Sequence, residues 1–119
     1  MSLDALDPVG QVLSAALDGV ALRQRVIADN IANVDTPNFR ATSVDFESSL
    51  RAALDDGQFD PSELTVSSAP TDTPVGANGN NVDLRKETLA AVQSQYTYQV
   101  LTRAIGDKFN LVKFAVGGQ

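Results

Sequence analysis

Residues 29–40 read DNIANVDTPNFR and decide how the first part of the chain folds. Asn33 can cap the end of a helix, and Pro37 biases the residue before it away from helical backbone. Phe39 then supplies an apolar anchor just beyond the proline. Asn30 and Asn33, three residues apart, share one face of the helix that ends here. We therefore predict a helix that stops near Asn33 and a rigid helix-to-loop corner after it.

The segment before this corner, residues 8–34, has the pattern of an amphipathic helix. Steps of seven from Leu6 meet an aliphatic residue each time, and steps of seven from Leu3 do so at most positions. The seam residues are Leu13, Leu17, Val20, Ile27 and Ile31. Because Gly10 and Gly19 each cost about 1 kcal/mol relative to alanine, the helix is predicted to be marginal by itself.

A second long helix is predicted over residues 83–116, with Asp83 as its N-cap. Two lines of apolar residues run along it and make a wide stripe that can meet more than one neighbour. The seam residues here are Leu89, Val92, Tyr96, Tyr98, Leu101, Ile105 and Val112.

The middle segment differs from both helices. A short helix over 46–54 fits the spacing of its apolar residues, whereas residues 55–82 have the composition of a loop. The expected fold is mainly α and forms one domain. It consists of an N-terminal helix (1–34), the corner with an acidic, partly extended or disordered segment (35–82), and a C-terminal helix (83–119). The two long helices pair in a coiled-coil-like manner.

Composition excludes several functions. The formal net charge of -6 argues against nucleic acid as a partner, and the absence of Cys and His removes the usual nucleophile, general base and metal ligands. No apolar run reaches the roughly 20 residues of a membrane-spanning helix, and the N-terminus lacks the pattern of a cleaved secretory signal. We therefore expect no enzymatic activity, no cofactor, no metal and no direct membrane insertion.

Charge is unevenly distributed along the chain. Residues 35–82 carry eight acidic and two basic side chains, whereas residues 83–119 carry three acidic and five basic ones. The acids Asp55, Asp56, Asp60 and Glu63 do not have the spacing of a calcium-binding EF-hand loop. A solvated acidic loop is the better interpretation, although a metal- or carboxylate-dependent hydrolase is one alternative function.

The corner also resembles the signature of the bacterial flagellar axial family, which includes rod, hook and hook-associated proteins. That signature has the form A-N-x-x-A-N-x-x-T-x-G-Y/F, and its matching positions here are Asn30, Ala32, Asn33, Thr36 and Phe39. Asn38 replaces the glycine, and asparagine is the next most tolerant residue of a positive φ.

The likeness narrows to the proximal-rod members of this family in the residues that follow. The matching residues are Asp35, Thr36, Pro37, Phe39, Arg40, Ala41, Asp45 and Phe46. A second similar stretch is Gly79-Asn80-Asn81-Val82-Asp83 with Glu87, at the start of the C-terminal helix.

The resemblance implies a structural subunit of the flagellar rod that is exported unfolded, without a cleaved signal, and polymerises through its terminal helices. The implied location is the periplasmic rod of the basal body. The implied partners are other rod subunits, copies of the same chain, and ring and export-gate components at the rod base. Two further alternatives are another subunit of the same shaft, and a helical adaptor or chaperone-like module that docks a partner helix.

Overall fold

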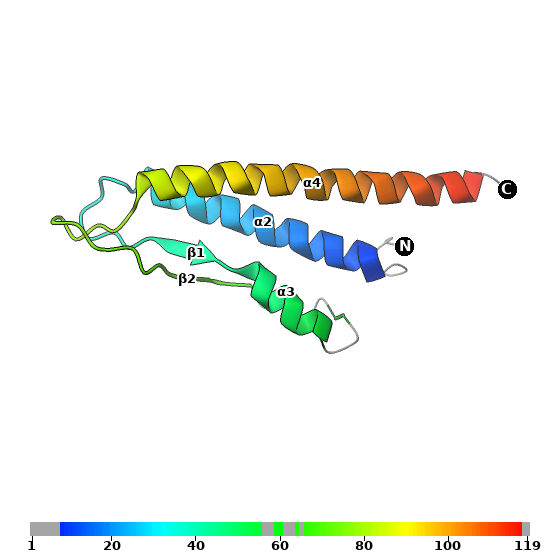
Figure 1. Cartoon of the computed structure of the whole chain (residues 1–119), viewed down its shortest axis with the longest axis horizontal. Helices are drawn as coiled ribbons and strands as arrows, with labels where there is room; N and C mark the ends of the chain where they lie inside the picture. The colour runs from blue at the N-terminus through cyan, green and yellow to red at the C-terminus, as the bar shows by residue number, and fades with distance from the viewer. Residues whose placement is uncertain (1–7, 56–58, 61–63, 65, 118–119) are drawn as a thin grey trace.

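A computed structural model describes residues 8–55, 59–60, 64 and 66–117 (Figure 1). The elements in chain order are α2 (Pro8–Ala32), β1 (Thr42–Val44), α3 (Phe46–Asp55), β2 (Ser68–Pro70) and α4 (Leu84–Gly117). The three predicted helices are confirmed, each to within two residues at its ends. Leu3 and Leu6, with which the N-terminal seam was expected to begin, lie outside the described residues.

The two long helices lie side by side, and an arm made of β1, α3 and β2 runs along another side of α2 (Figure 1). Val20 is fully buried and Ile27 nearly so. Gln24, which interrupts the seam, donates from its Nε2 to Gln95 Oε1 of α4 at 3.3 Å. The helix pair therefore accommodates this polar position by pairing it with another amide across the seam.

The core lies where α2, the arm and α4 meet. A cluster of Ala16, Val20, Val44 and Phe46 forms its centre, and Leu101 of α4 packs against it. Among the described residues the buried hydrophobic side chains number only six. A core of this size is small for the described residues, and much of the wide apolar stripe expected over 83–116 lies outside it.

The sequence analysis did not predict the antiparallel pairing of β1 with β2, in which Thr42 faces Pro70 and Val44 faces Ser68. The backbone groups of Thr42 bond to the side chain of Asn30, so they point away from β2. Pro70, opposite Thr42, accordingly presents its backbone to the free edge of the sheet, where its missing N–H breaks no ladder bond.

Ser94 of α4 is 2% exposed, and its hydroxyl has no hydrogen-bond partner among the described residues. An unpaired buried hydroxyl costs about 1–3 kcal/mol, and alanine is also the better helix former. We therefore expect Ser94→Ala to raise the free energy of unfolding by about 1 kcal/mol, measured by urea denaturation. Lower stability in this variant would show that the hydroxyl is satisfied after all.

Candidate functional site

The corner, defined as residues 29–41 together with residues 78–83, joins the end of α2 to the start of α4. Asn30 is its innermost residue and is 1% exposed. Its Nδ2 donates to the Thr42 carbonyl oxygen at 2.7 Å, and its Oδ1 accepts from the Thr42 amide at 3.2 Å. The side chain of Asn30 therefore takes the place of a neighbouring strand for Thr42.

Asn33 ends α2 in the way the sequence predicts. Its backbone amide and its side-chain Nδ2 both donate to the Asp29 carbonyl oxygen, at 3.2 Å and 2.8 Å, so the side chain adds a second bond to the last turn of the helix. The hydroxyl of Thr36 donates to Asn33 Oδ1 at 3.0 Å, and the Thr36 amide donates to the Asn33 carbonyl at 3.1 Å. These bonds fix the direction in which the chain leaves the helix.

Asn38 has a φ of 66°, which confirms the expectation that this position needs a residue tolerant of left-handed backbone. Its amide donates to the Asn78 carbonyl oxygen at 3.0 Å. Gly79, with a φ of 80°, lies against it, and a Cβ at Gly79 would overlap the Asn38 side chain. Both positions are therefore restricted to residues that tolerate positive φ, and Gly79 is restricted to glycine by space as well.

Asn80 ties the two long helices together, a role that the sequence analysis did not assign. Its Nδ2 donates to the carbonyl oxygens of Asn33 and Thr36, both at 2.8 Å. Its Oδ1 accepts from the Val82 amide at 2.7 Å. One buried side chain thus binds the exit of α2 and shapes the approach to α4.

Asn81 connects the segment before α4 to the chain that leads into β1 and to the chain that follows β2. Its Oδ1 accepts from the Ala41 amide at 2.6 Å, and its Nδ2 donates to the Thr73 carbonyl at 3.2 Å. Its amide donates to the Phe39 carbonyl at 3.3 Å. The signal that could have identified both asparagines was the G-N-N-V-D stretch, whose short polar side chains readily bond to nearby backbone.

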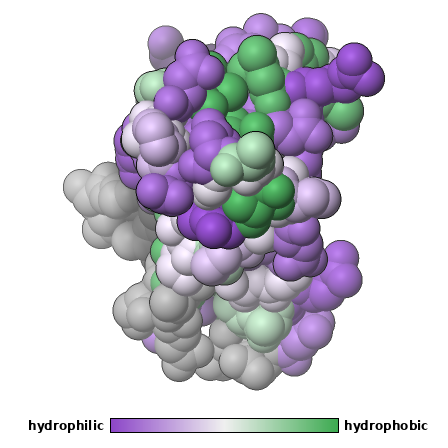
Figure 2. Space-filling view, turned by 90° about the vertical axis from the view of Figure 1, so that its left-hand side faces the viewer, coloured by the Kyte–Doolittle hydropathy of each residue, from purple (hydrophilic) through white to green (hydrophobic). Residues whose placement is uncertain are grey.

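Seen from the corner end, the molecule shows mostly hydrophilic residues around smaller hydrophobic areas (Figure 2). The asparagines that organise the corner are nevertheless largely buried, since Asn80 is 7% and Asn81 6% exposed. The chemistry of the corner is therefore structural, because its polar atoms are used in holding backbone in place.

Phe46 anchors the arm to α2. Its ring is 4% exposed and lies against Gly19, where an added Cβ would stand 2.5 Å from Phe46 Cγ. The sequence analysis treated Gly19 only as a weakness of the helix. The structure shows that the absence of a side chain there makes room for the ring.

Arg23 reinforces this anchor, and the sequence analysis missed it. Its guanidinium lies 4.7 Å from the centroid of the Phe46 ring and donates to the Val44 carbonyl oxygen at 2.9 Å. It also forms an ion pair with Glu47. Because Glu47 is half exposed, we attribute the anchoring mainly to the ring contact and the backbone bonds.

Asp45 is the N-cap of α3. Its carboxylate accepts from the Ser48 hydroxyl at 2.7 Å and from the Ser48 amide at 3.1 Å. The hydroxyl bond, the amide bond and the nearby charges of Arg23 and Arg51 hold the pKa of Asp45 below its ordinary value of 3.8. Above that pH the Asp45 carboxylate is therefore ionised and accepts both hydrogen bonds.

A pH dependence follows from this lowered pKa. Because the folded state binds the proton less readily than the unfolded state, the contribution of Asp45 to stability is lost as the pH falls from 3.8 through the lower, folded pKa. Asp45→Asn retains a capping oxygen that does not titrate. We expect the wild type to lose its stability advantage over Asp45→Asn in this range, measured by urea denaturation. A constant difference would contradict the assignment.

The structure brings together most of the predicted motif. Asn30, Asn33 and Thr36 make the bonds described above, Phe39 is half-buried in the corner, and Asp45 and Phe46 hold α3. The remaining motif residues, Ala32, Asp35 and Pro37, are exposed at the end of α2 and in the turn after it.

The predicted seam residues divide into three groups. Val20 and Ile27 are buried and Leu13, Leu17, Ile31, Leu101 and Ile105 half-buried. Leu89, Val92 and Tyr96 are 59%, 63% and 69% exposed, and Tyr98 is 37% exposed. Val112 lies in α4, but its side chain is outside what the structure describes.

Two properties of the described residues bear on function. No three acidic side chains among them gather closely enough to hold a metal ion. The acids Asp56 and Glu63, considered above for calcium, lie outside these ranges. Within the same ranges, neither α2 nor α4 combines the length and the hydropathy of a helix that crosses a bilayer.

The helix pair and its corner define a class of protein. Residues 11–40, which cover most of α2 and the first part of the corner, match the family model described as "Flagella basal body rod protein". Most of the chain is similar to curated proteins named "Flagellar basal body rod protein FlgB". The relative from Bacillus subtilis is 38% identical over 91% of this chain and 92% of its own length. Those from Borreliella burgdorferi and Escherichia coli are 32% and 30% identical over 84% and 87% of this chain, and 89% and 88% of their own lengths. The chain belongs to the FlgB family of structural rod proteins.

Proposed function

We propose that the protein is a structural subunit of the proximal flagellar rod, exported unfolded and polymerised through its terminal helices. The observation that carries the polymerisation is an outer stripe on α4, made of Leu89, Val92, Tyr96, Val100, Leu111 and Phe114. Each of these side chains is at least 50% exposed.

The outer stripe lies opposite the face of α4 that packs on α2. Glu87, Ser94 and Leu101, which step by seven, are buried or half-buried towards the rest of the chain. The first four outer stripe residues recur three or four positions apart, and Leu111 and Phe114 lie on the same side further along the helix. An apolar stripe in addition to the face that packs on α2 supports contacts with two neighbours, of which the described residues supply only one.

The small core supports export in an unfolded state. Folding buries few large side chains among the described residues, so unfolding the chain before passage needs little work. The proposed partners are other rod subunits, copies of this chain, and ring and export-gate components at the base of the rod.

The test is detection of the protein in purified hook–basal bodies, from normal cells and from cells lacking the activity of the flagellar export ATPase. We expect the protein in the first preparation and its loss from the second. Absence from intact basal bodies, with soluble protein in the cytoplasm, would contradict the proposal.

The outer stripe can be tested in the same preparations. We expect Val92→Asp to remove the protein from basal bodies, because a charge would enter an apolar contact. Gln93→Asp, at the adjacent exposed position outside the outer stripe, is the matched control and should remain. Equal incorporation of both variants would show that the outer stripe is not used in assembly.

A further inference from the structure

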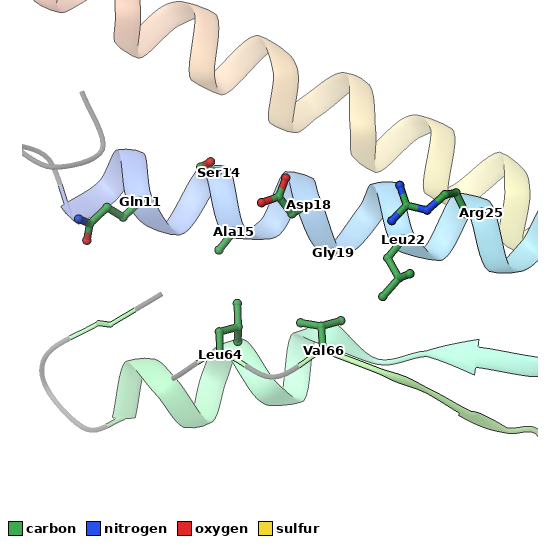
Figure 3. A pocket seen from close by; sticks show the side chains of 9 residues that line it. All are labelled: Gln11, Ser14, Ala15, Asp18, Gly19, Leu22, Arg25, Leu64 and Val66. Carbon is green, nitrogen blue, oxygen red and sulfur yellow. The ribbon is translucent and has the colours of Figure 1, made fainter. Parts of the chain in front are cut away.

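A groove separates α2 from the end of the arm. Its volume is about 430 Å³. The side chains of Leu64 and Val66 point towards it from the arm, and Ala15 and Leu22 point towards it from α2 (Figure 3). Gly19 and the polar residues Gln11, Ser14, Asp18 and Arg25 of α2 complete its lining. The groove thus has an apolar floor and a polar rim with one charge of each sign.

The second half of the outer stripe on α4 has a matching composition. Between Val100 and Leu111, which are 50% and 67% exposed, Arg103 and Asp107 occupy the same face of the helix. All four charged residues, Asp18 and Arg25 at the groove and Arg103 and Asp107 on α4, are exposed. None of their side chains makes a hydrogen bond or ion pair with another described residue.

We propose that this groove binds α4 of a second copy of the chain, antiparallel to α2, with Arg103 of one copy beside Asp18 of the other. The proposal rests on the proposed function, since it names the surfaces through which copies meet. It goes further in assigning the groove, which the intramolecular helix pair does not use.

This single alignment brings several complementary residues together. Stepping along two antiparallel helices from the Arg103–Asp18 pair places Val100 beside Leu22, and Tyr96 beside the guanidinium of Arg25. In the other direction, Asp107 comes beside the hydroxyl of Ser14, and Leu111 beside Gln11. Val100 therefore meets an apolar residue, Leu111 lies along the aliphatic part of Gln11, and each charge meets an opposite charge, a hydroxyl or an aromatic ring.

The antiparallel direction follows from the polarity of a shaft. Copies that all point the same way along the shaft bring α4 of one copy beside α2 of the next. The two helices then run antiparallel to each other, as α2 and α4 do inside one chain. Within the chain, Gln24 lies opposite Gln95. The proposed alignment differs from that intramolecular one by two residues, an axial offset of about 3 Å. Neighbouring copies would therefore lie at nearly the same level.

The net charges of the two segments also support binding of α4 from a second copy in the groove. The arm that forms one wall of the groove belongs to residues 35–82, which carry eight acidic and two basic side chains. The incoming helix belongs to residues 83–119, which carry three acidic and five basic ones. Opposite net charges steer the two surfaces together.

Cysteine cross-linking tests the contact directly, because the chain has no cysteine of its own. Gln11→Cys and Leu111→Cys are produced together as separate copies, and their basal bodies are treated with a short bismaleimide. We expect a dimer band. The matched control pairs Gln11→Cys with Val116→Cys, which is 70% exposed near the same end of α4 but outside the outer stripe, and should give several-fold less dimer. Equal yields, or cross-links of Gln11→Cys only to a different protein, would overturn the proposal.

Charge reversal supplies a second test. We expect Asp18→Lys and Arg103→Glu each to reduce incorporation into basal bodies about tenfold, because like charges then face each other at the contact. The double variant should regain most of the loss, whereas additive losses would overturn the pairing.

The two proposals fail in different ways. Absence of the wild-type protein from basal bodies contradicts the rod function. In that case, cross-linking of the purified chain at high concentration still tests whether the groove binds α4 of a second copy. Presence in basal bodies without the Gln11–Leu111 cross-link leaves the rod function intact and rejects the groove.

Discussion

Replacing Asn80 by alanine is expected to lower the free energy of unfolding by about 3 kcal/mol and to abolish swarming. The change removes one hydrogen bond from each of the carbonyl oxygens of Asn33 and Thr36, which keep only their bonds from the turn amides, and it removes the side-chain acceptor of the Val82 amide. Each such loss costs about 1 kcal/mol or more. Urea denaturation measures the stability and a soft-agar assay measures the swarming.

Two further variants sharpen this result. Asn110→Ala changes an exposed asparagine of α4 and should be neutral or slightly stabilising, because alanine is the better helix former. Asn80→Asp keeps the size of the side chain and the oxygen that accepts from Val82, but it places a second oxygen against the two carbonyls. It should be at least as damaging as Asn80→Ala. Normal stability of both Asn80 variants would refute the role assigned to this side chain.

Gly19→Ala is expected to destabilise the protein by about 1–3 kcal/mol, although the same change normally strengthens a helix. The added Cβ would stand within 3 Å of three atoms of Phe46, including Cγ at 2.5 Å, and overpacking of this kind outweighs the gain in helix propensity. Thermal or urea denaturation provides the measurement.

Gly106 is the matched control for Gly19. It also lies inside a helix, but a Cβ there meets nothing within 4 Å, so Gly106→Ala should stabilise the protein by about 0.5–1 kcal/mol. A double-mutant cycle of Gly19→Ala with Phe46→Leu should show that the penalty depends on the ring. The same sign of effect at Gly19 and Gly106 would refute the packing argument.

The sequence predicts those features that depend on local pattern. Heptad spacing and the cap at Asp83 define the long helices, and Asp83 Oδ1 indeed accepts from the Lys86 amide at 3.2 Å. The end of α2 follows from Asn33 and Pro37, and the left-handed backbone of Asn38 follows from its place in the motif. Each of these depends on residues within a few positions of one another.

The features that sequence reasoning missed depend on partners far apart in the chain. Asn80 bonds to carbonyls 47 and 44 positions away, and Arg23 meets Glu47 across 24 positions. The pairing of β1 with β2 likewise needs Asn30 and Asn81 to hold its residues in register. Gly19 was judged by helix propensity alone, because only the packed structure shows the ring that needs the space.

The position of Pro70 has a consequence for the behaviour of many copies held close together. An exposed strand edge offers a template on which other extended chains can add, and repeated addition leads to cross-β aggregates. On the free edge of β2, Pro70 withholds the donor that such addition would need at its position. The short strand therefore remains a two-stranded element when local concentration is high, and self-association is directed to the helices.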